Sequence, residues 1–240
     1  MKIITLGTSH GACEKNRFCS GTLLLTNGAA YLFDCGGAVE GTMTNLDIPT
    51  HIIKATFISH MHEDHVGTLS SIAKNFAIYH YSFKTKFFLP EENGVEGFKN
   101  WLKTIHIPLN DALSFGTVKE GKVYEDENIS VCAIPTMHIA GVPTFAYEVE
   151  CEGKKIIYTG DLTNDFGDFP KVAFEENFDL IISEFTHCSI QTMLNVVGQS
   201  KTKKVIFTHI YPHDEAPVLE ATKKMPFDVT FAKDGQEFNI

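Results

Sequence analysis

Short apolar runs recur along the whole chain and predict β-strands. They are rich in β-branched and aromatic residues, which suit a pleated and partly buried surface. The runs lie at 2–6, 22–26, 31–33, 55–59, 131–134, 145–149, 155–158, 180–183, 205–208 and 229–232. Between some of them, apolar residues recur every three or four positions, which predicts helices. These helical patterns lie at 66–76, 91–104, 190–197 and 214–223.

The order of these elements favours an α/β protein with two mixed sheets covered by helices. The strands come in meandering groups without strict alternation of strand and helix, so a purely parallel barrel fits less well. No linker rich in Pro, Gly or Ser divides the chain, and no internal repeat or low-complexity tract is found. We therefore expect a single domain over residues 1–240.

Composition and charge narrow the classes of function. The chain has 240 residues, of which 43% are hydrophobic, and this excludes an intrinsically disordered protein. Twenty basic and thirty acidic residues give a net charge of −10. A protein that relies on its own positive field to hold a nucleic-acid backbone is therefore disfavoured.

The sequence also bears on the cellular compartment. No apolar stretch approaches the roughly 20 residues of a membrane span, and residues 1–7 are too short for a signal peptide. We therefore expect a cytoplasmic protein without a membrane partner. The six cysteines lack Cys-x-x-Cys spacing, so they indicate free thiols rather than a disulfide framework or a thiolate zinc site.

The segment Ser59–His65 carries the strongest chemical signal. Three histidines and one aspartate fall within six residues, between an apolar strand at 55–58 and a helix predicted to begin near Val66. A loop leaving the strand can turn His60 and His62 to one side, while Asp64 and His65 reach a second point nearby. Two cations could therefore be held, because imidazole and carboxylate suit zinc and also iron or manganese.

Three later residues also follow predicted strands, as the first cluster does. His138, Asp161 and His209 each follow an apolar run, at 133–137, 156–160 and 205–208 respectively. Side chains that follow strands gather at one edge of a sheet. Together with the first cluster, they make a set of seven candidate metal ligands.

This set resembles the metallo-β-lactamase superfamily, whose HxHxDH signature matches His60, His62, Asp64 and His65. The resemblance implies an αβ/βα sandwich with two divalent metal ions, for which zinc is expected and manganese or iron is also suitable. It implies that one ion is held by His60, His62 and His138, the other by Asp64, His65 and His209, and that Asp161 bridges them. Asp34 resembles the family's early aspartate, which supports a metal-binding loop through hydrogen bonds. The alternative interpretation is that Asp34 is a simple turn residue in the segment Asp-Cys-Gly-Gly.

The implied reaction is hydrolysis by a hydroxide made available near neutral pH by the metal ions. Asp64 would orient that nucleophile and accept its proton, so we predict it as catalytic. His187 follows another apolar strand and is the candidate proton donor, or a contact to a substrate oxygen; the alternative is a histidine bonded to backbone. His10 could also face the site. Thr8, Ser9 and Arg17 are weaker candidates for binding a phosphate, because no P-loop lysine follows them.

Within the superfamily, the chain most resembles the branch that contains ribonuclease Z and small phosphodiesterases. The matching features are Leu6-Gly7-Thr8, Phe33-Asp34-Cys35-Gly36 and His209. Ribonuclease Z enzymes commonly insert a long substrate-gripping arm between the third metal histidine and the bridging aspartate, but only 22 residues separate His138 from Asp161 here. With the negative charge, this predicts a small phosphodiester or cyclic nucleotide as the substrate and makes nucleic acid an unexpected partner.

Other functions share the same ligands. The main alternative is a hydrolase of thioesters, lactones or other carboxylic esters; β-lactams are disfavoured by the expected compartment. A diiron redox protein would carry a carboxylate ligand in place of His62 and would need a flavin domain. A scaffold module without activity would usually have lost some ligands, and none is lost here. A homodimer is suggested by related small phosphodiesterases and is left open by the sequence.

Overall fold

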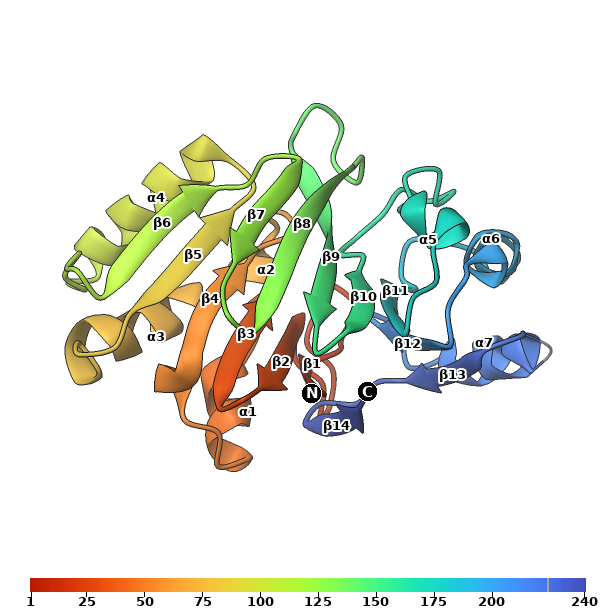
Figure 1. Cartoon of the computed structure of the whole chain (residues 1–240), viewed down its shortest axis with the longest axis horizontal. Coiled ribbons are helices and arrows are strands. Elements are labelled where there is room, and N and C mark those ends of the chain that lie inside the picture. The colour runs from red at the N-terminus through yellow and green to blue at the C-terminus, as the bar shows by residue number, and fades with distance from the viewer. Residues whose placement is uncertain (224) are drawn as a thin grey trace.

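A computed structural model describes residues 1–223 and 225–240 of the chain, and the strands in this part form two seven-stranded sheets. The two sheets lie face to face (Figure 1). The first sheet has the order β14 (Gln236–Asn239), β1 (Lys2–Gly7), β2 (Gly21–Thr26), β3 (Ala29–Phe33), β4 (Ile53–Phe57), β5 (Thr85–Leu89) and β6 (Leu113–Thr117). The second has the order β13 (Asp228–Phe231), β12 (Lys204–Thr208), β11 (Leu180–Glu184), β10 (Lys154–Tyr158), β9 (Thr144–Cys151), β8 (Ile129–Thr136) and β7 (Gly121–Glu125).

Each sheet is half antiparallel and half parallel. In the first, β14, β1, β2 and β3 pair antiparallel, whereas β3 to β6 pair parallel. In the second, β7 to β10 pair antiparallel and β10 to β13 pair parallel. It follows that β8, β10, β11 and β12 all end at the same edge. The expected pair of mixed sheets is confirmed.

Helices cover the outer face of both sheets, which gives the αβ/βα sandwich that was predicted. Figure 1 shows α3 and α4 beside β5 and β6, and α5, α6 and α7 around the other sheet. The first sheet carries α1 (Val39–Asn45), η1 (Thr50–Ile52), α2 (Glu63–Val66), α3 (Leu69–Lys74), η2 (Asn75–Tyr79) and α4 (Glu92–Thr104). The second carries α5 (Val172–Glu175), α6 (Ile190–Val196), η3 (Val197–Gln199) and α7 (Glu215–Thr222).

The central strands are buried on both faces. Along β1, Ile3 packs into the core between the sheets, while Ile4 packs under the helices. Along β3, Tyr31 and Leu32 alternate in the same way. Successive side chains of a strand point to opposite faces, so a strand covered on both sides reads as a continuous apolar run. This is why the sequence pattern located these strands.

Two further expectations are tested by the described residues. All six cysteines are free thiols, as predicted, and Cys19, Cys35 and Cys151 are buried. Within residues 1–223 and 225–240, none of the helices combines the length and the apolar character that crossing a bilayer requires.

Candidate metal centre

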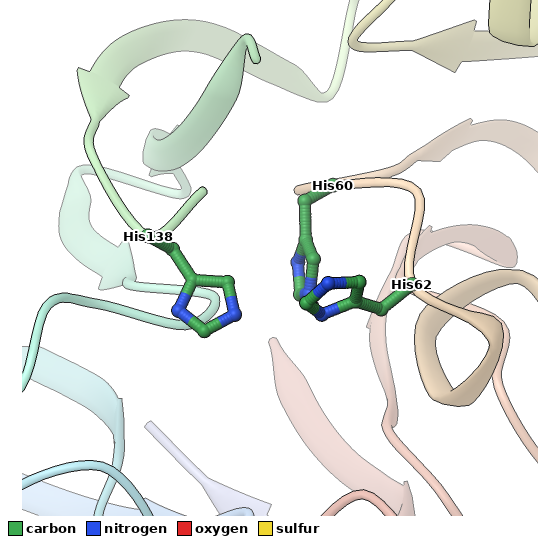
Figure 2. A group of neighbouring side chains, drawn as sticks. All are labelled: His60, His62 and His138. Atoms are coloured by element: carbon green, nitrogen blue, oxygen red, sulfur yellow. The ribbon is translucent and has the colours of Figure 1, made fainter. Parts of the chain in front are cut away.

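The seven predicted ligands come together where loops leave β4, β8, β10 and β12 at one edge of the sandwich. The first group is made of three histidines, His60, His62 and His138, and one ring nitrogen from each lies within 4.8 Å of the other two. Figure 2 shows these rings converging, with His60 and His62 opposite His138. His60 Nε2 lies 3.0 Å from His62 Nδ1. The group therefore offers nitrogen ligands from both sheets.

A second group adjoins the first and consists of Asp64, His65, Asp161 and His209, which are all buried. His65 Nε2 lies 3.3 Å from Asp64 Oδ2 and 3.4 Å from Asp161 Oδ1. Asp161 Oδ2 also lies 3.8 Å from both His60 Nε2 and His138 Nε2. The Asp161 carboxylate is thus within reach of both groups.

The signature segment is partly helical, which corrects the prediction that it is a loop and that a helix begins near Val66. His62 has extended backbone, and α2 begins directly after it, at Glu63. Two acidic residues in the first turn, Glu63 and Asp64, favour this start because they complement the helix dipole. Asp64 and His65 are therefore presented by a helical turn, whereas His60 and His62 precede it.

Close backbone packing holds this turn in place. The Cys35 N–H donates to the His65 carbonyl at 2.8 Å, and the Thr68 N–H donates to the Cys35 carbonyl at 3.0 Å. At Gly36, an added Cβ would lie 1.7 Å from the Asp64 carbonyl oxygen. Glycine is therefore required there, because a side chain would push the turn that carries two ligands out of position.

Asp34 supports the centre as the resemblance implied, rather than serving as a simple turn residue. Its carboxylate is fully buried and accepts hydrogen bonds from the Ser59 N–H and hydroxyl, the His65 Nδ1–H and the Tyr158 hydroxyl, all at 2.7 Å. Because Asp34 accepts the Nδ1–H of His65, the ring is oriented with Nε2 toward the cluster, and the neutral ring would present its Nε2 lone pair to a cation there.

The same tautomer is fixed in three other histidines. The Ser59 hydroxyl donates to Asp34, so the His60 Nδ1–H must donate to Ser59 Oγ at 3.0 Å. The Thr186 hydroxyl donates to the His209 carbonyl, so the His209 Nδ1–H donates to Thr186 Oγ1 at 3.0 Å. The third, His138, donates its Nδ1–H to the Leu162 carbonyl at 3.1 Å. In each neutral ring the remaining nitrogen, Nε2, would carry the lone pair that a cation needs.

These residues fit divalent cations. In the described part of the chain, three of the buried side-chain atoms without a hydrogen-bond partner are His65 Nε2, His138 Nε2 and Asp161 Oδ1. Unpaired polar atoms of this kind are costly, and cations bound to the two groups would satisfy all three. Burial and the neighbouring His65 lower the pKa of His60 to about 2, so its imidazole is neutral and able to coordinate. For Asp161, burial raises the pKa, but His209 and His65 outweigh burial and hold it well below its usual range.

His187 lies beside these groups and is held by a buried acid that the sequence pattern did not reveal. Its Nδ1 is 3.9 Å from Asp161 Oδ2 and 2.9 Å from both carboxylate oxygens of Glu184. Glu184 ends β11 and also accepts the backbone N–H groups of His187 and Leu162. Burial lowers the pKa of His187, but the Glu184 carboxylate outweighs burial and raises it. The available signal was an acid at the end of an apolar strand, three residues before a histidine.

The first loop reaches the rim of the centre. His10 stacks on Tyr211 with 3.7 Å between the ring centroids, and its Nε2 lies 3.1 Å from Glu14 Oε1. Gly11 follows it, and its N–H donates to His209 Nε2 at 3.2 Å. The loop therefore touches the centre through the backbone of Gly11, while the ring of His10 is engaged by Tyr211 and Glu14.

The prediction of a phosphate-binding role for Thr8, Ser9 and Arg17 is wrong, because protein groups occupy all three side chains. The hydroxyl of Thr8 donates to Asp234 at 2.7 Å, and that of Ser9 donates to the Ala12 carbonyl. The buried guanidinium of Arg17 pairs with Glu215 and donates to the carbonyls of Ile210 and Ala232. Arg17 therefore fixes the backbone next to His209.

A cluster of five histidines and two aspartates at the edge of an αβ/βα sandwich defines a metal-dependent hydrolase of the metallo-β-lactamase fold. A solved structure described as the metallo-β-lactamase fold protein YhfI from Bacillus subtilis superposes with a TM-score of 0.81 at 19% identity, and the match covers 99% of this chain and 98% of that one. The chain belongs to the family described as Anti-Pycsar protein Apyc1, whose sequence model matches residues 1–238.

Two curated relatives show how far the similarity extends. The Anti-Pycsar protein Apyc1 of Bacillus phage BSP38 is 24% identical over 246 aligned residues, covering 94% of each chain. Ribonuclease Z of Methanocaldococcus jannaschii is 30% identical over 151 residues, covering 61% of this chain. The aligned part spans about half (46%) of the length of that ribonuclease Z.

Proposed function

We propose that the protein is a two-metal phosphodiesterase that hydrolyses a small phosphodiester, with a cyclic nucleotide as the leading substrate class. The observation that carries the proposal is the convergence of two ligand groups on Asp161, with histidine nitrogens turned toward it from both groups. His60, His62 and His138 would hold one ion, and Asp64, His65 and His209 would hold the other. We expect zinc, with manganese or iron as substitutes.

The chemistry divides between the ions and the side chains. Two bound divalent cations would supply Lewis acidity and lower the pKa of water to near neutrality. Asp64 faces the same space, with Oδ2 3.1 Å from His209 Nε2, and would orient the attacking water and accept its proton. The mechanism needs no serine or cysteine nucleophile.

His187 would act at the other end of the reaction, as the proton donor to the leaving oxygen. Glu184 accepts its Nδ1–H, so Nε2 is the atom available to the substrate. Because Glu184 raises the pKa of His187, a larger share of its imidazole is protonated near neutral pH. A proton donor with this pKa suits an alkoxide leaving group.

The shape of the chain around the centre supports a small substrate. Of the residues between His138 and Asp161, β9 and β10 take up Thr144–Cys151 and Lys154–Tyr158. Only a short loop at 139–143 and tight turns remain, and these do not form an arm that could grip tRNA. The net charge of −10 also disfavours a polyanionic partner. Ribonuclease Z relatives are, by name, nucleases, which cleave phosphodiester bonds.

Hydrolysis by purified protein, reconstituted separately with zinc and with manganese, tests this function. The substrates are bis(p-nitrophenyl) phosphate, a panel of cyclic nucleotides, a precursor tRNA and a simple carboxylic ester. His62→Ala is the test variant, and His106→Asn, at an exposed position with left-handed backbone, is the matched control.

We expect diester and cyclic nucleotide turnover that is lost in His62→Ala and kept in His106→Asn. Ester turnover without diester turnover would favour the thioester, lactone or carboxylic ester alternative. Processing of precursor tRNA at a higher kcat/KM than any small diester would contradict the proposed substrate class.

A further inference from the structure

Asp168 lies between the two loops that carry His138 and Asp161, and its side chain takes no part in the cluster itself. Its carboxylate is largely buried. Oδ2 accepts the N–H of Met137, the residue before His138, at 2.7 Å. Oδ1 accepts the N–H of Thr163 at 3.0 Å and its hydroxyl at 2.7 Å. The Asp168 carboxylate therefore links the backbone of Met137, next to His138, to the backbone of Thr163, two residues after Asp161.

The same two loops meet directly at a second place. The His138 Nδ1–H donates to the Leu162 carbonyl, and the Leu162 N–H donates to Glu184 Oε1 at 2.7 Å. The segment after Asp161 is thus anchored at Leu162 by Glu184 and at Thr163 by Asp168. On the His138 side, Asp168 holds the backbone and Leu162 orients the ring.

We propose that Asp168 is a positioning residue that sets the separation of His138 from Asp161 and thereby the affinity for the ion held by His60, His62 and His138. The inference rests on the proposed two-ion centre and not on its substrate. Groups behind metal ligands typically change metal affinity by about 10- to 100-fold when they are replaced, because they fix the geometry of the ligands.

A carboxylate is required by the chemistry of this position, because all three partners are donors. Asparagine has the same shape but only one acceptor oxygen. If that oxygen stays on Thr163, which supplies two donors, the amide NH₂ faces the N–H of Met137. The hydrogen bond from the Met137 N–H is then lost, and that N–H faces the amide NH₂, which is also a donor. Asp168→Asn is therefore expected to release the loop that carries His138 while the Thr163 side stays bound.

A matched control lies on the same loop. Asp165 is exposed; its Oδ1 accepts the Gly167 N–H at 3.0 Å and lies 2.9 Å from the hydroxyl oxygen of Thr163, whose proton is donated over the shorter distance to Asp168. It shares the partner Thr163 with Asp168 but makes no hydrogen bond to Met137. Asp165→Asn therefore perturbs the loop by the same chemical change without cutting the link between the two ligand loops.

The experiment measures stepwise zinc binding to metal-free protein by competition with a chromophoric chelator, without substrate. We expect Asp168→Asn to lower the affinity for one of the two zinc ions by about 10- to 100-fold and to leave the affinity for the other unchanged within about threefold. Asp165→Asn should bind both as the native protein does. In a hydrolysis assay, excess zinc should restore kcat of Asp168→Asn while KM stays at the native value.

Two results would overturn the proposal: native affinity for both ions in Asp168→Asn, or equal weakening in Asp168→Asn and Asp165→Asn. If Asp168→Asn does not fold, Thr163→Val removes only the hydroxyl contacts and should weaken the binding of one zinc ion more than that of the other. Native affinity for both ions in Thr163→Val would then count against the proposal. Because zinc is measured without substrate, failure of the phosphodiesterase proposal would show separately, as two bound ions without diester turnover.

Discussion

Replacing Asp34 by asparagine is expected to weaken metal binding at His65 while the chain still folds. Asp34 accepts four hydrogen bonds at 2.7 Å, from two groups of Ser59, from His65 and from Tyr158. In Asp34→Asn, the amide oxygen can still accept the Ser59 N–H. The hydroxyls of Ser59 and Tyr158 can rotate to accept from the amide NH₂, but the imidazole of His65 can do so only by moving its proton to Nε2.

The magnitude follows from that change of tautomer. A proton on Nε2 occupies the lone pair that faces the cluster, so binding an ion requires the unfavourable tautomer. We expect the affinity for one ion to fall by about 10- to 100-fold, or about 1.4–2.8 kcal/mol. Asp34→Ala is unsuitable, because four buried donors without an acceptor would cost about 1–3 kcal/mol each. That sum is comparable to the whole stability of a domain, about 5–15 kcal/mol.

Asp126→Asn is the matched control for this prediction. Asp126 lies just before β8, away from His138 at its other end, and accepts hydrogen bonds from Tyr31, Tyr124 and two backbone N–H groups. The assay is zinc competition on both variants, with thermal unfolding alongside. Native zinc affinity in Asp34→Asn, or an equal loss in Asp126→Asn, would refute the reasoning from the tautomer.

Three further outcomes are expected. Glu184→Gln should move the alkaline limb of the pH–rate profile to lower pH, because Glu184 raises the pKa of His187. A proton donor loses activity as pH rises through its pKa. An unmoved limb would exclude His187 as the donor. Arg17→Met should lower the free energy of unfolding, measured in urea, by about 3 kcal/mol. The change leaves the Glu215 carboxylate and the carbonyls of Ile210 and Ala232 without their donor. A decrease below about 1 kcal/mol would contradict this prediction. Removing metal with a chelator should lower Tm by about 5–10 °C, which corresponds to losing a ligand present at about 100 times its Kd. An unchanged Tm would show that the cluster does not bind metal.

The centre of each sheet and the ligand cluster could be predicted because their signals are local. Central strands are covered on both faces, so they read as apolar runs, and the candidate ligands stand directly after them. The resemblance then added Asp34, whose hydrogen bonds to Ser59 and His65 the structure shows. A turn residue and a supporting residue have the same local sequence, so only the family pattern separated them.

Most of the strands at the sheet edges were not predicted, although the edge strand β13 was. The strands β5, β6, β7 and β14 were missed, and each of them carries charged or polar residues at exposed positions. In β14, Phe238 is the buried residue, and its partner strand β1 lies at the opposite end of the chain. Pairing over such a separation leaves no periodic signal in either segment.

The roles of Arg17 and Glu184 depended on contacts made in the folded state. Arg17 meets Ile210 and Glu215, which are nearly 200 positions away, so a basic residue in a glycine-containing loop was interpreted as an anion ligand. Glu184 directly follows the run predicted at 180–183 and was given no role. Only the folded chain places its carboxylate under His187 and against the Leu162 N–H, next to Asp161.

The central claim, a two-ion phosphodiesterase, is tested most directly by titrating metal-free protein with zinc while following hydrolysis of bis(p-nitrophenyl) phosphate. The account predicts a rate that rises until about two zinc ions are present per chain, and no rise in Asp161→Asn. Saturation at one ion per chain, or no diester hydrolysis at any zinc concentration, would contradict it.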